Sequence, residues 1–129
     1  TDSNVKNIIK SSKICPSIYK SYNKQYGFGI PQFLFDVAIC KGFTMAYDTI
    51  DSKFLFEEDI IYVKSHEEYL ENIMLYLNDE ENRLLWSNKL FNNVINNHTY
   101  HHRLYNIMKE IGYSSVADEI QLNLTKRKS

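Results

Sequence analysis

The segment over residues 27–42, which reads GFGIPQFLFDVAICKG, constrains the fold of this chain more than any other. A proline suits the first turn of a helix, because its φ is already helical and its missing N–H would have no partner there. Three apolar residues after the proline recur at the spacing of one buried helical face: Phe35, Ala38 and Ile39. The pattern therefore predicts a helix over residues 31–41, closed by Gly42 and followed by a short buried strand over residues 43–47.

A loop, a helix and a strand in this order form the second half of a βαβ unit, whose ligands bind at the loop that opens the helix. The backbone N–H groups of Gly27 and Gly29 are candidates for phosphate binding, since glycine lets an anion approach the backbone closely. The alternative is that the two glycines only permit a tight turn. Tyr47 and Asp48 leave the carboxyl end of the predicted strand and are expected to face the same crevice.

Strands of the same short, apolar kind are predicted at residues 13–16 and 60–63, and residues 19–29 are interpreted as a loop. Three short strands separated by helices favour a parallel sheet covered by helices, which is the α/β class. We expect a partial Rossmann-like domain with a short parallel sheet flanked by helices and a helical C-terminal part. Three strands are few for such a domain, so further strands are expected in a segment before Thr1.

The remaining helices are predicted from their caps and their apolar spacing. The segment from Ser65 to Glu68 has the form of a capping box. Thr99 caps a helix over residues 100–111, and Gly112 fits the left-handed position after that helix. The other predicted helical segments are residues 1–12 with Ser3 as cap, a turn at 50–56 with Phe54, Leu55 and Phe56 inward, residues 80–96 with a stripe of Leu84, Leu85, Phe91, Val94 and Ile95, and residues 115–124 capped by Ser115.

The composition argues against several classes of protein. The chain has 129 residues, 15 of them basic and 16 acidic, and this balance gives no overall field to attract nucleic acid or an anionic membrane. No stretch approaches the roughly 20 apolar residues of a membrane span, and none has the form of a signal peptide. Cys15 and Cys40 lie in apolar segments. Two buried thiols in a reducing, cytoplasmic compartment are expected, and a single disulfide is the alternative.

Three histidines, His98, His101 and His102, fall at i, i+3 and i+4 and therefore on one helical face. Metal ligation is one interpretation of such a cluster. No cysteine or acidic residue nearby completes a coordination shell, so we expect no metal site. Capping and packing around the helix that follows Thr99 is the preferred interpretation.

From Ile30 to about Ile111, the order and spacing of these segments resemble the C-terminal domain of the spore-maturation CgeB-type glycosyltransferases, within the two-Rossmann-domain (GT-B) group. That family pattern is an apolar helix of the form pqRxFExxAxGG, a strand, an acidic segment with a capped helix, and an H-T-Y-x-H-R signature. The corresponding segments here read PQFLFDVAICKG, FTMAYDT, FLFEEDIIYVKSHEEYLENIMLYLNDEENR and HTYHHR.

The resemblance implies transfer of a sugar from a nucleotide-sugar donor, which this domain would bind over residues 1–112, with residues 113–129 as a C-terminal helix or tail. It assigns the donor-binding carboxylate of the helix to Asp36. Phe33 stands where the family has an arginine and Lys41 where it has a glycine, while Phe28 occupies the position of a glutamate in related retaining enzymes. The alternative is therefore a non-catalytic Rossmann-like module that binds a partner or serves a structural role.

The expected partners are a nucleotide-sugar, which is a substrate rather than a cofactor, and an N-terminal GT-B domain of the same parent chain. Because that domain would supply the acceptor site and any base, the chain by itself is expected to show no turnover. The candidate donor-binding residues are Gly27, Gly29, Gln32, Asp36, Tyr47 and Asp48.

Overall fold

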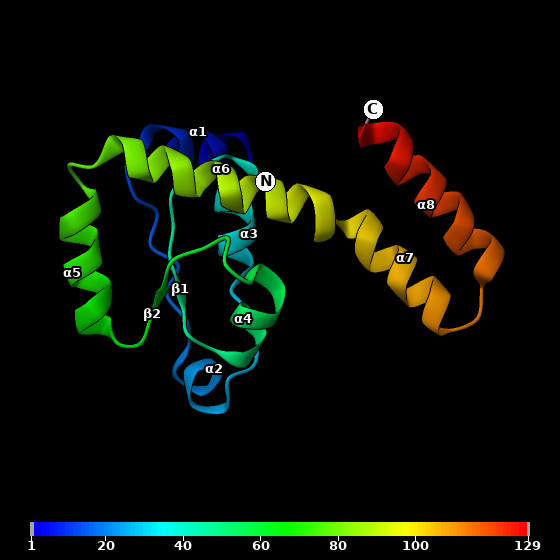
Figure 1. The fold of residues 1–129 in the computed structure, drawn as a ribbon, viewed down its shortest axis with the longest axis horizontal. Coiled ribbons are helices and arrows are strands. Elements are labelled where there is room, and N and C mark those ends of the chain that lie inside the picture. The colour runs from blue at the N-terminus through cyan, green and yellow to red at the C-terminus, as the bar shows by residue number, and fades with distance from the viewer. Residues whose placement is uncertain (1, 129) are drawn as a thin grey trace. The chain divides into compact units, whose positions relative to one another are not determined.

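A computed structural model of the chain describes residues 2–128, which are mostly helical and contain one short parallel sheet (Figure 1). By its contacts the chain divides into two compact units between Val94 and Ile95. The elements are α1 (Ser3–Ser11), α2 (Ser21–Tyr26), α3 (Gln32–Ile39), β1 (Ala46–Tyr47), α4 (Ile50–Phe56), β2 (Tyr62–Val63), α5 (His66–Tyr76), α6 (Glu80–Asn97), α7 (Tyr100–Glu110) and α8 (Ser114–Lys128).

The sheet consists of β1 and β2, which run parallel with Ala46 opposite Tyr62 and Tyr47 opposite Val63. Both strands lie inside segments predicted as strands, and α4 provides the crossover that parallel strands require. The structure is therefore compatible with part of an α/β domain.

The strand predicted at residues 13–16 is wrong, although this segment lies beside the chain that enters β1. Only one backbone hydrogen bond joins the two among the described residues, from the Cys15 N–H to the Phe43 carbonyl at 2.9 Å. Pro16 has no N–H, and the Ser17 N–H donates instead to the Tyr69 hydroxyl at 3.0 Å. The ladder therefore stops after one bond, and the segment stays extended without becoming a strand.

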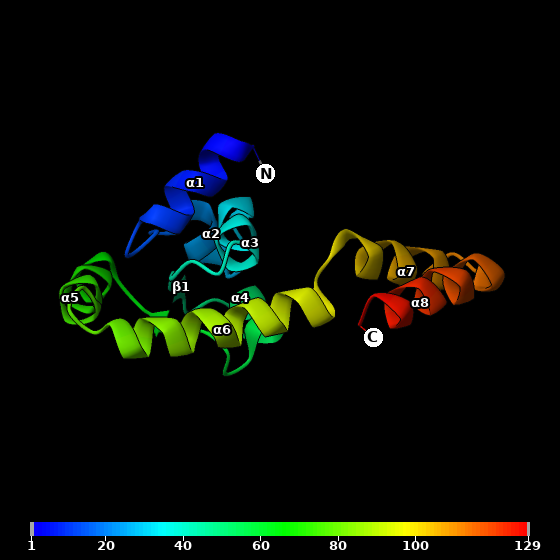
Figure 2. The ribbon, with the colours of Figure 1, turned by 90° about the horizontal axis from the view of Figure 1, so that it is seen from above.

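Helices cover both sides of the sheet. Figure 2 shows α1 and α3 on one side of β1 and α4 and α6 on the other. The core between them is aromatic, with the Tyr47 ring 5.3 Å from that of Tyr19 and 5.5 Å from that of Tyr69. The buried residues of this cluster are Tyr19, Leu34, Phe35, Ala38, Phe43, Met45, Ala46, Tyr47, Phe56, Ile60, Val63, Tyr69, Leu90 and Val94.

Helix α3 buries more of its surface than one stripe. Leu34, Phe35 and Ala38 face the main core, while Val37 packs in a second cluster with Ile9 of α1 and both cysteines, which are free thiols. Ile39, expected in the buried stripe, is 47% exposed. A helix that is apolar nearly all round is buried on several sides, so its sequence does not single out one face.

The prediction that Gly42 closes α3 is not met, because the helix ends at the C-cap Cys40, two residues earlier. Lys41 takes the left-handed conformation with φ 56°, and Pro31 is the N-cap rather than a residue of the first turn. A Cβ on Gly42 would lie 2.8 Å from both Ile9 Cγ2 and Val37 Cγ1. The glycine is therefore needed for close packing of α1 against α3.

Three further predictions for the first unit are wrong. Residues 19–29 contain the helix α2, which sequence periodicity missed because SYNKQY has no apolar stripe. Phe54, expected to point inward, is 80% exposed, whereas Phe56 is fully buried. Asp2 rather than Ser3 caps α1, through a 2.7 Å bond from the Asn4 N–H.

Of the stripe expected on helix α6, Val94 is buried as predicted. The buried residues of the helix are Ser87, Leu90 and Val94, whereas Leu84 and Leu85 are more than half exposed. The buried stripe is partly polar, because position 87 carries a serine. A stripe chosen from apolar residues alone therefore leaves this position out. The Ser87 hydroxyl is satisfied by the Arg83 carbonyl at 2.7 Å.

In the second unit α7 packs against α8. The predicted cap of α7 is confirmed, because the Thr99 side chain accepts from the His102 N–H while the His102 side chain accepts from the Thr99 N–H. Gly112 has φ 87°, as expected for the left-handed residue after a helix. Helix α8 begins one residue before the predicted cap Ser115 and runs beyond residue 124.

Candidate functional site at the carboxyl ends of the parallel strands

Two helices begin where the strands end. The Thr49 side chain caps α4 by accepting from the Ser52 N–H at 3.2 Å, and the Ser65 side chain caps α5 by accepting from the Glu68 N–H at 3.1 Å. Both helices therefore start at the carboxyl edge of the sheet. Helix N-termini carry partial positive charge, which Asp51 in the first turn of α4 and Glu67 and Glu68 in the first turn of α5 partly offset.

Tyr47, Lys24 and His66 form a hydrogen-bonded chain at this edge, which we call the Lys24–His66–Tyr47 cluster. The Tyr47 hydroxyl lies 2.5 Å from Nδ1 of His66, and the Lys24 ammonium lies 2.8 Å from Nε2 of the same ring. The ammonium also lies 4.9 Å from the centre of the Tyr47 ring, a favourable cation–π distance. The cluster thus joins α2, the end of β1 and the first residue of α5.

The positive charge of Lys24 in the cluster is partly balanced by the nearby carboxylate of Glu67. Burial raises the pKa of the Tyr47 hydroxyl, and the neighbouring Tyr69 and Glu67 raise it further. Glu67 has a lowered pKa, because its own backbone N–H and the Ser65 hydroxyl bind its carboxylate and because His66 and Lys24 lie nearby. At neutral pH the cluster therefore combines a neutral phenol, a cation and a nearby carboxylate.

The glycine loop is held by internal hydrogen bonds. The Gly27 N–H donates to the Asn23 carbonyl at 2.9 Å, and the Gly29 N–H donates to Oδ2 of Asp51 at 2.5 Å. Asn23 Nδ2 in turn donates to the Phe28 carbonyl at 2.7 Å. Both predicted phosphate-binding N–H groups thus have acceptors already, and one of these acceptors is a carboxylate.

The other predicted residues lie after β1 and in α3. Asp48 follows β1 and forms an ion pair with Lys53 at 2.9 Å. Gln32 is the first residue of α3 and is exposed, and Asp36 is half-buried one turn further on. Among the residues that the structure describes, no side chain caps α3 by a hydrogen bond. Asp51, in the first turn of α4, accepts the hydrogen bond from the Gly29 N–H. Because α4 begins directly after β1, the glycine loop lies near the carboxyl end of β1.

Three residues of this edge were missed by sequence reasoning, namely Lys24, Asp51 and His66. Lys24 and His66 are 42 positions apart, and Gly29 and Asp51 are 22 apart, so no local spacing could pair them. The only available signal was position, because His66 directly follows the cap Ser65 and Asp51 follows the cap Thr49.

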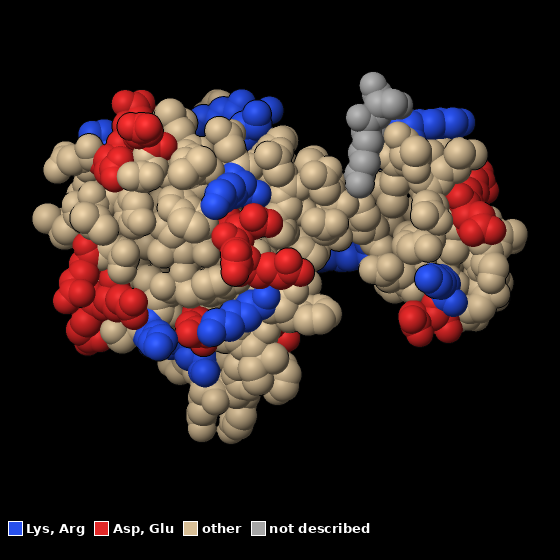
Figure 3. Space-filling view, viewed as in Figure 1, with Lys and Arg blue, Asp and Glu red and all other residues tan. Residues whose placement is uncertain are grey.

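Aromatic side chains project from α2 and the loop after it. Tyr22, Tyr26 and Phe28 are each more than half exposed. On the face drawn in Figure 3, α2 lies under an uncharged projection, whereas acidic and basic side chains are interspersed above it. Exposed rings of this kind stack on bases or sugars, or they lie in an interface.

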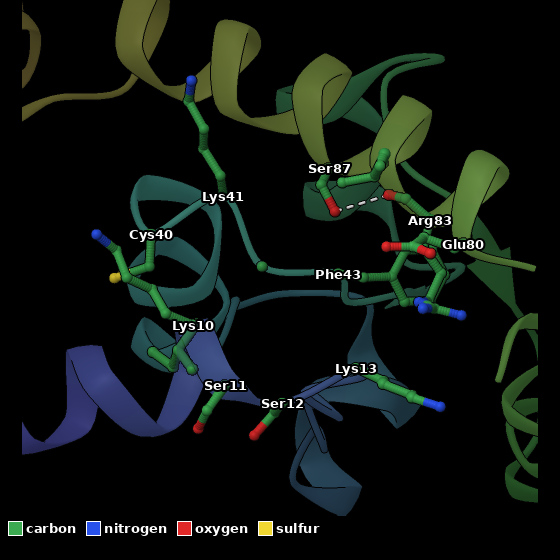
Figure 4. Close-up of a pocket in the computed structure, with 13 residues that line it drawn as sticks. Lys10, Ser11, Ser12, Lys13, Cys40, Lys41, Phe43, Glu80, Arg83 and Ser87 are labelled. Carbon is green, nitrogen blue, oxygen red and sulfur yellow. Dashed lines mark hydrogen bonds between the residues drawn. The ribbon is translucent and has the colours of Figure 1, made fainter.

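A cavity of about 290 Å³ lies away from this edge, between α1, the end of α3 and the start of α6 (Figure 4). Lys10, Lys13 and Lys41 line it, but their side chains point away from one another. The Arg83 guanidinium donates to the carbonyls of Tyr76 and Leu77 and so caps the end of α5. The cations of this cavity therefore do not converge on a ligand.

Two histidines of the second unit, His101 and His102, contact other residues of that unit. His102 completes the cap of α7, and His101 Nδ1 lies 3.2 Å from Arg127 Nη1. Across residues 2–128, no group of three or more His, Cys, Asp or Glu side chains is placed to hold a metal ion. Within the same range, no helix combines the length and the apolar content needed to cross a membrane.

Comparison with known families decides the class of protein. A family model described as glycosyl transferase-like matches residues 1–109, which is most of the chain. The chain belongs to the glycosyl transferase-like family. Searches among curated proteins and among solved structures gave no match.

Membership in this family confirms the glycosyltransferase part of the resemblance drawn from the sequence. The match includes all of the strand-end edge described above and ends within α7. A glycosyltransferase role for the chain is therefore supported by its family.

Proposed function

We propose that this chain is the donor-binding part of a nucleotide-sugar-dependent glycosyltransferase of the GT-B group, and that the donor binds at the carboxyl edge of β1 and β2. The observation that carries the proposal is the Lys24–His66–Tyr47 cluster beside the N-termini of α4 and α5, in a chain of the glycosyl transferase-like family. In open α/β sheets, ligands bind outside the carboxyl ends of the strands.

The diphosphate of the donor would bind next to Lys24 and the uncapped start of α3. Gly27 and Gly29 have internal acceptors for their N–H groups, so they shape the loop rather than hold the phosphates directly. Asp36 and Asp48 offer carboxylate oxygens to the hydroxyls of the ribose or sugar, and Gln32 at the start of α3 offers an amide. The exposed rings of Tyr22, Tyr26 and Phe28 offer stacking surfaces for the base.

The chemistry proposed for these residues is positioning and charge stabilisation. When the sugar leaves the donor, negative charge develops on the nucleoside diphosphate. The Lys24 ammonium would stabilise that charge, and it is a cation that Phe33 at the family's arginine position does not supply. The acceptor and any general base would come from the N-terminal domain of the parent protein.

Ligand-observed NMR tests the proposal with UDP, GDP, ADP, CMP and their common sugar conjugates. We expect one nucleotide family to bind, and we expect Lys24→Gln and Asp36→Ala to weaken that binding about tenfold each, the loss of one charge-assisted contact. Lys20→Gln is the matched control, because Lys20 is an exposed lysine just before α2 and is not part of the cluster. No binding by the folded chain would overturn the proposal.

A second candidate is a non-catalytic module with the same fold. Two observations favour it: the phenylalanines at positions 28 and 33, and the internal hydrogen bonds that already occupy the glycine loop. Such a module would be indifferent to every nucleotide in the screen, and Lys24→Gln would then change only stability. The same experiment therefore separates the two candidates.

A further inference from the structure

The two nitrogens of the His66 ring have different partners. Nδ1 lies 2.5 Å from the Tyr47 hydroxyl, and Nε2 lies 2.8 Å from the Lys24 ammonium. An ammonium cannot accept a hydrogen bond, so its contact with Nε2 uses the lone pair of that nitrogen. The same lone pair is the place where the neutral ring would bind a further proton. The Lys24 ammonium and a proton therefore compete for Nε2.

This competition links the charge of the ring to the position of the lysine. A protonated ring carries an N–H at Nε2, and that N–H would point at the ammonium. Neither group could then accept a hydrogen bond, and two positive charges in contact repel each other. His66 thus binds the Lys24 ammonium as a neutral ring, and Nε2 is open to a proton once the ammonium has moved away.

Titratable groups face the ring from the three elements around it: Lys24 from α2, Tyr47 from β1 and Glu67 from α5 itself. Tyr47 stays a neutral phenol at neutral pH, because burial raises the pKa of its hydroxyl above the usual value. Its oxygen can accept from Nδ1–H whether or not the ring is charged. The Glu67 carboxylate lies near the ring and favours a positive charge on it.

The cluster is open on the side of Nε2 and closed on the side of Nδ1. His66 is exposed and Lys24 is half-buried, whereas Tyr47 is only 2% exposed. The Tyr47 ring also packs edge-to-face on the His66 ring, with 5.6 Å between the ring centres. Tyr47 therefore holds the imidazole in one orientation, with Nε2 directed at the place that the ammonium occupies.

We infer that His66 is a second ligand of the donor diphosphate and that it binds the diphosphate as an imidazolium. In the donor site proposed above, on which this inference rests, the Lys24 ammonium turns to the diphosphate. Nε2 then takes up one proton from the solvent and donates it in a hydrogen bond to a phosphate oxygen, while Nδ1–H donates to the Tyr47 hydroxyl. The charge of the ring adds to that of Lys24, so donor binding is coupled to the uptake of one proton.

Isothermal titration calorimetry of the full 129-residue chain tests this coupling with UDP-glucose, GDP-mannose and ADP-glucose. The diphosphate of these compounds is esterified at both ends and lacks the terminal phosphate that titrates near pH 6, so a proton taken up on binding goes to the protein. Titrations at about pH 7.5 in buffers of different ionisation enthalpy should give an uptake of about 0.5 to 1 proton per ligand. The affinity should rise by up to about tenfold as the pH is lowered from about 8 to about 7.

His66→Gln removes the titrating ring and keeps a polar side chain at this exposed position. We expect the variant to bind about three- to tenfold more weakly and to take up no proton. His101→Gln is the matched control, because His101 contacts Arg127 of the second unit rather than the cluster. The control should keep both the affinity and the proton uptake. Imidazole ¹⁵N chemical shifts of the natural chain should show His66 as an imidazolium in the complex.

The outcomes separate a failure of the coupling from a failure of the donor site. If none of the three compounds binds to a chain that circular dichroism shows to be folded, the donor site is wrong and the coupling is wrong with it. Binding without proton uptake overturns the coupling and leaves the donor site in place. Proton uptake that His66→Gln retains has the same meaning, since another group would then bind the proton.

Discussion

The ammonium of Lys24 lies 2.8 Å from Nε2 of His66, and this contact favours one tautomer of the ring. An ammonium can only donate, so Nε2 must accept, and the neutral ring carries its proton on Nδ1. That proton then points to the Tyr47 hydroxyl oxygen at 2.5 Å. Imidazole ¹⁵N chemical shifts of the neutral ring should therefore report the Nδ1–H tautomer.

Lys24→Met should reverse this assignment. Without the donor at Nε2, the Tyr47 hydroxyl can donate to Nδ1, and we expect the Nε2–H tautomer to become the main form. Lys20→Met should leave the ring as it is in the natural chain. A ring that is already in the Nε2–H form with Lys24 present would contradict the prediction.

The Asp51 carboxylate accepts a hydrogen bond from the Gly29 N–H, close to the proposed position of the diphosphate. Asp51→Asn keeps an oxygen for this hydrogen bond but removes a negative charge from the edge. We therefore expect a nucleoside diphosphate to bind about three- to tenfold more tightly to the variant, as measured by NMR titration. Weaker binding would mean that the charge of Asp51 orders the loop rather than opposing the phosphate.

The Tyr69 hydroxyl connects three parts of the first unit. It accepts from the Ser17 N–H at 3.0 Å and donates to the Met45 carbonyl at 3.1 Å, and both partners are buried. Tyr69→Phe would leave two buried backbone groups without partners, so we expect a loss of about 2–4 kcal/mol in the free energy of unfolding. Tyr76→Phe on the same helix is the control, and urea denaturation should show a loss below about 1 kcal/mol.

The free energy of unfolding should fall at alkaline pH, because two tyrosines have raised pKa values in the folded chain. Burial raises the pKa of Tyr19 to about 12 and that of Tyr62 to about 12, whereas an unfolded tyrosine titrates near 10. The folded chain thus holds both protons more tightly. The stability gained in this way is complete below about pH 10 and is lost as the pH rises towards 12.

Tyr19→Phe removes one of the two titrating groups. The free energy of unfolding, measured by urea denaturation, should therefore fall less steeply between about pH 10 and 12. At neutral pH the variant should lose about 1 kcal/mol, because the Ser52 hydroxyl loses its contact with the Tyr19 hydroxyl at 2.5 Å and keeps only the Thr49 hydroxyl at 2.8 Å. Tyr22→Phe, at an exposed ring, should change neither quantity. An unchanged alkaline slope in Tyr19→Phe would show that other groups govern this range.

Caps and short apolar runs made much of the fold predictable. Ser65 and Thr99 are side chains whose capping role is local, and both cap as predicted. The burial of α6 was not predictable, because the tertiary structure buries Ser87 and Leu90 and leaves Leu84 more than half exposed. Local rules succeed where the interaction lies within four residues and fail where tertiary contacts decide.

The same distinction holds for the candidate site. Tyr47 and Asp48 were placed by a topological rule, since they end a parallel strand. Lys24 lies in a polar segment without periodicity, and its relation to His66 exists only after α2 and α5 meet at one edge. The sequence therefore indicates where the edge is but not which cation lies there.

The hydrogen bond between Ser17 and Tyr69 also bears on the order of folding. It closes a loop of 52 positions that contains α2, α3, both strands and α4, so its entropic cost is regained only after those elements have assembled. Residues 13–17 should thus gain protection late in pulse-labelled hydrogen exchange, and protection earlier than that of β1 would contradict this order. Before residues 13–17 bind, β1 has an unpaired edge on the side away from β2. A strand of another chain can add to that edge while the chain is still folding.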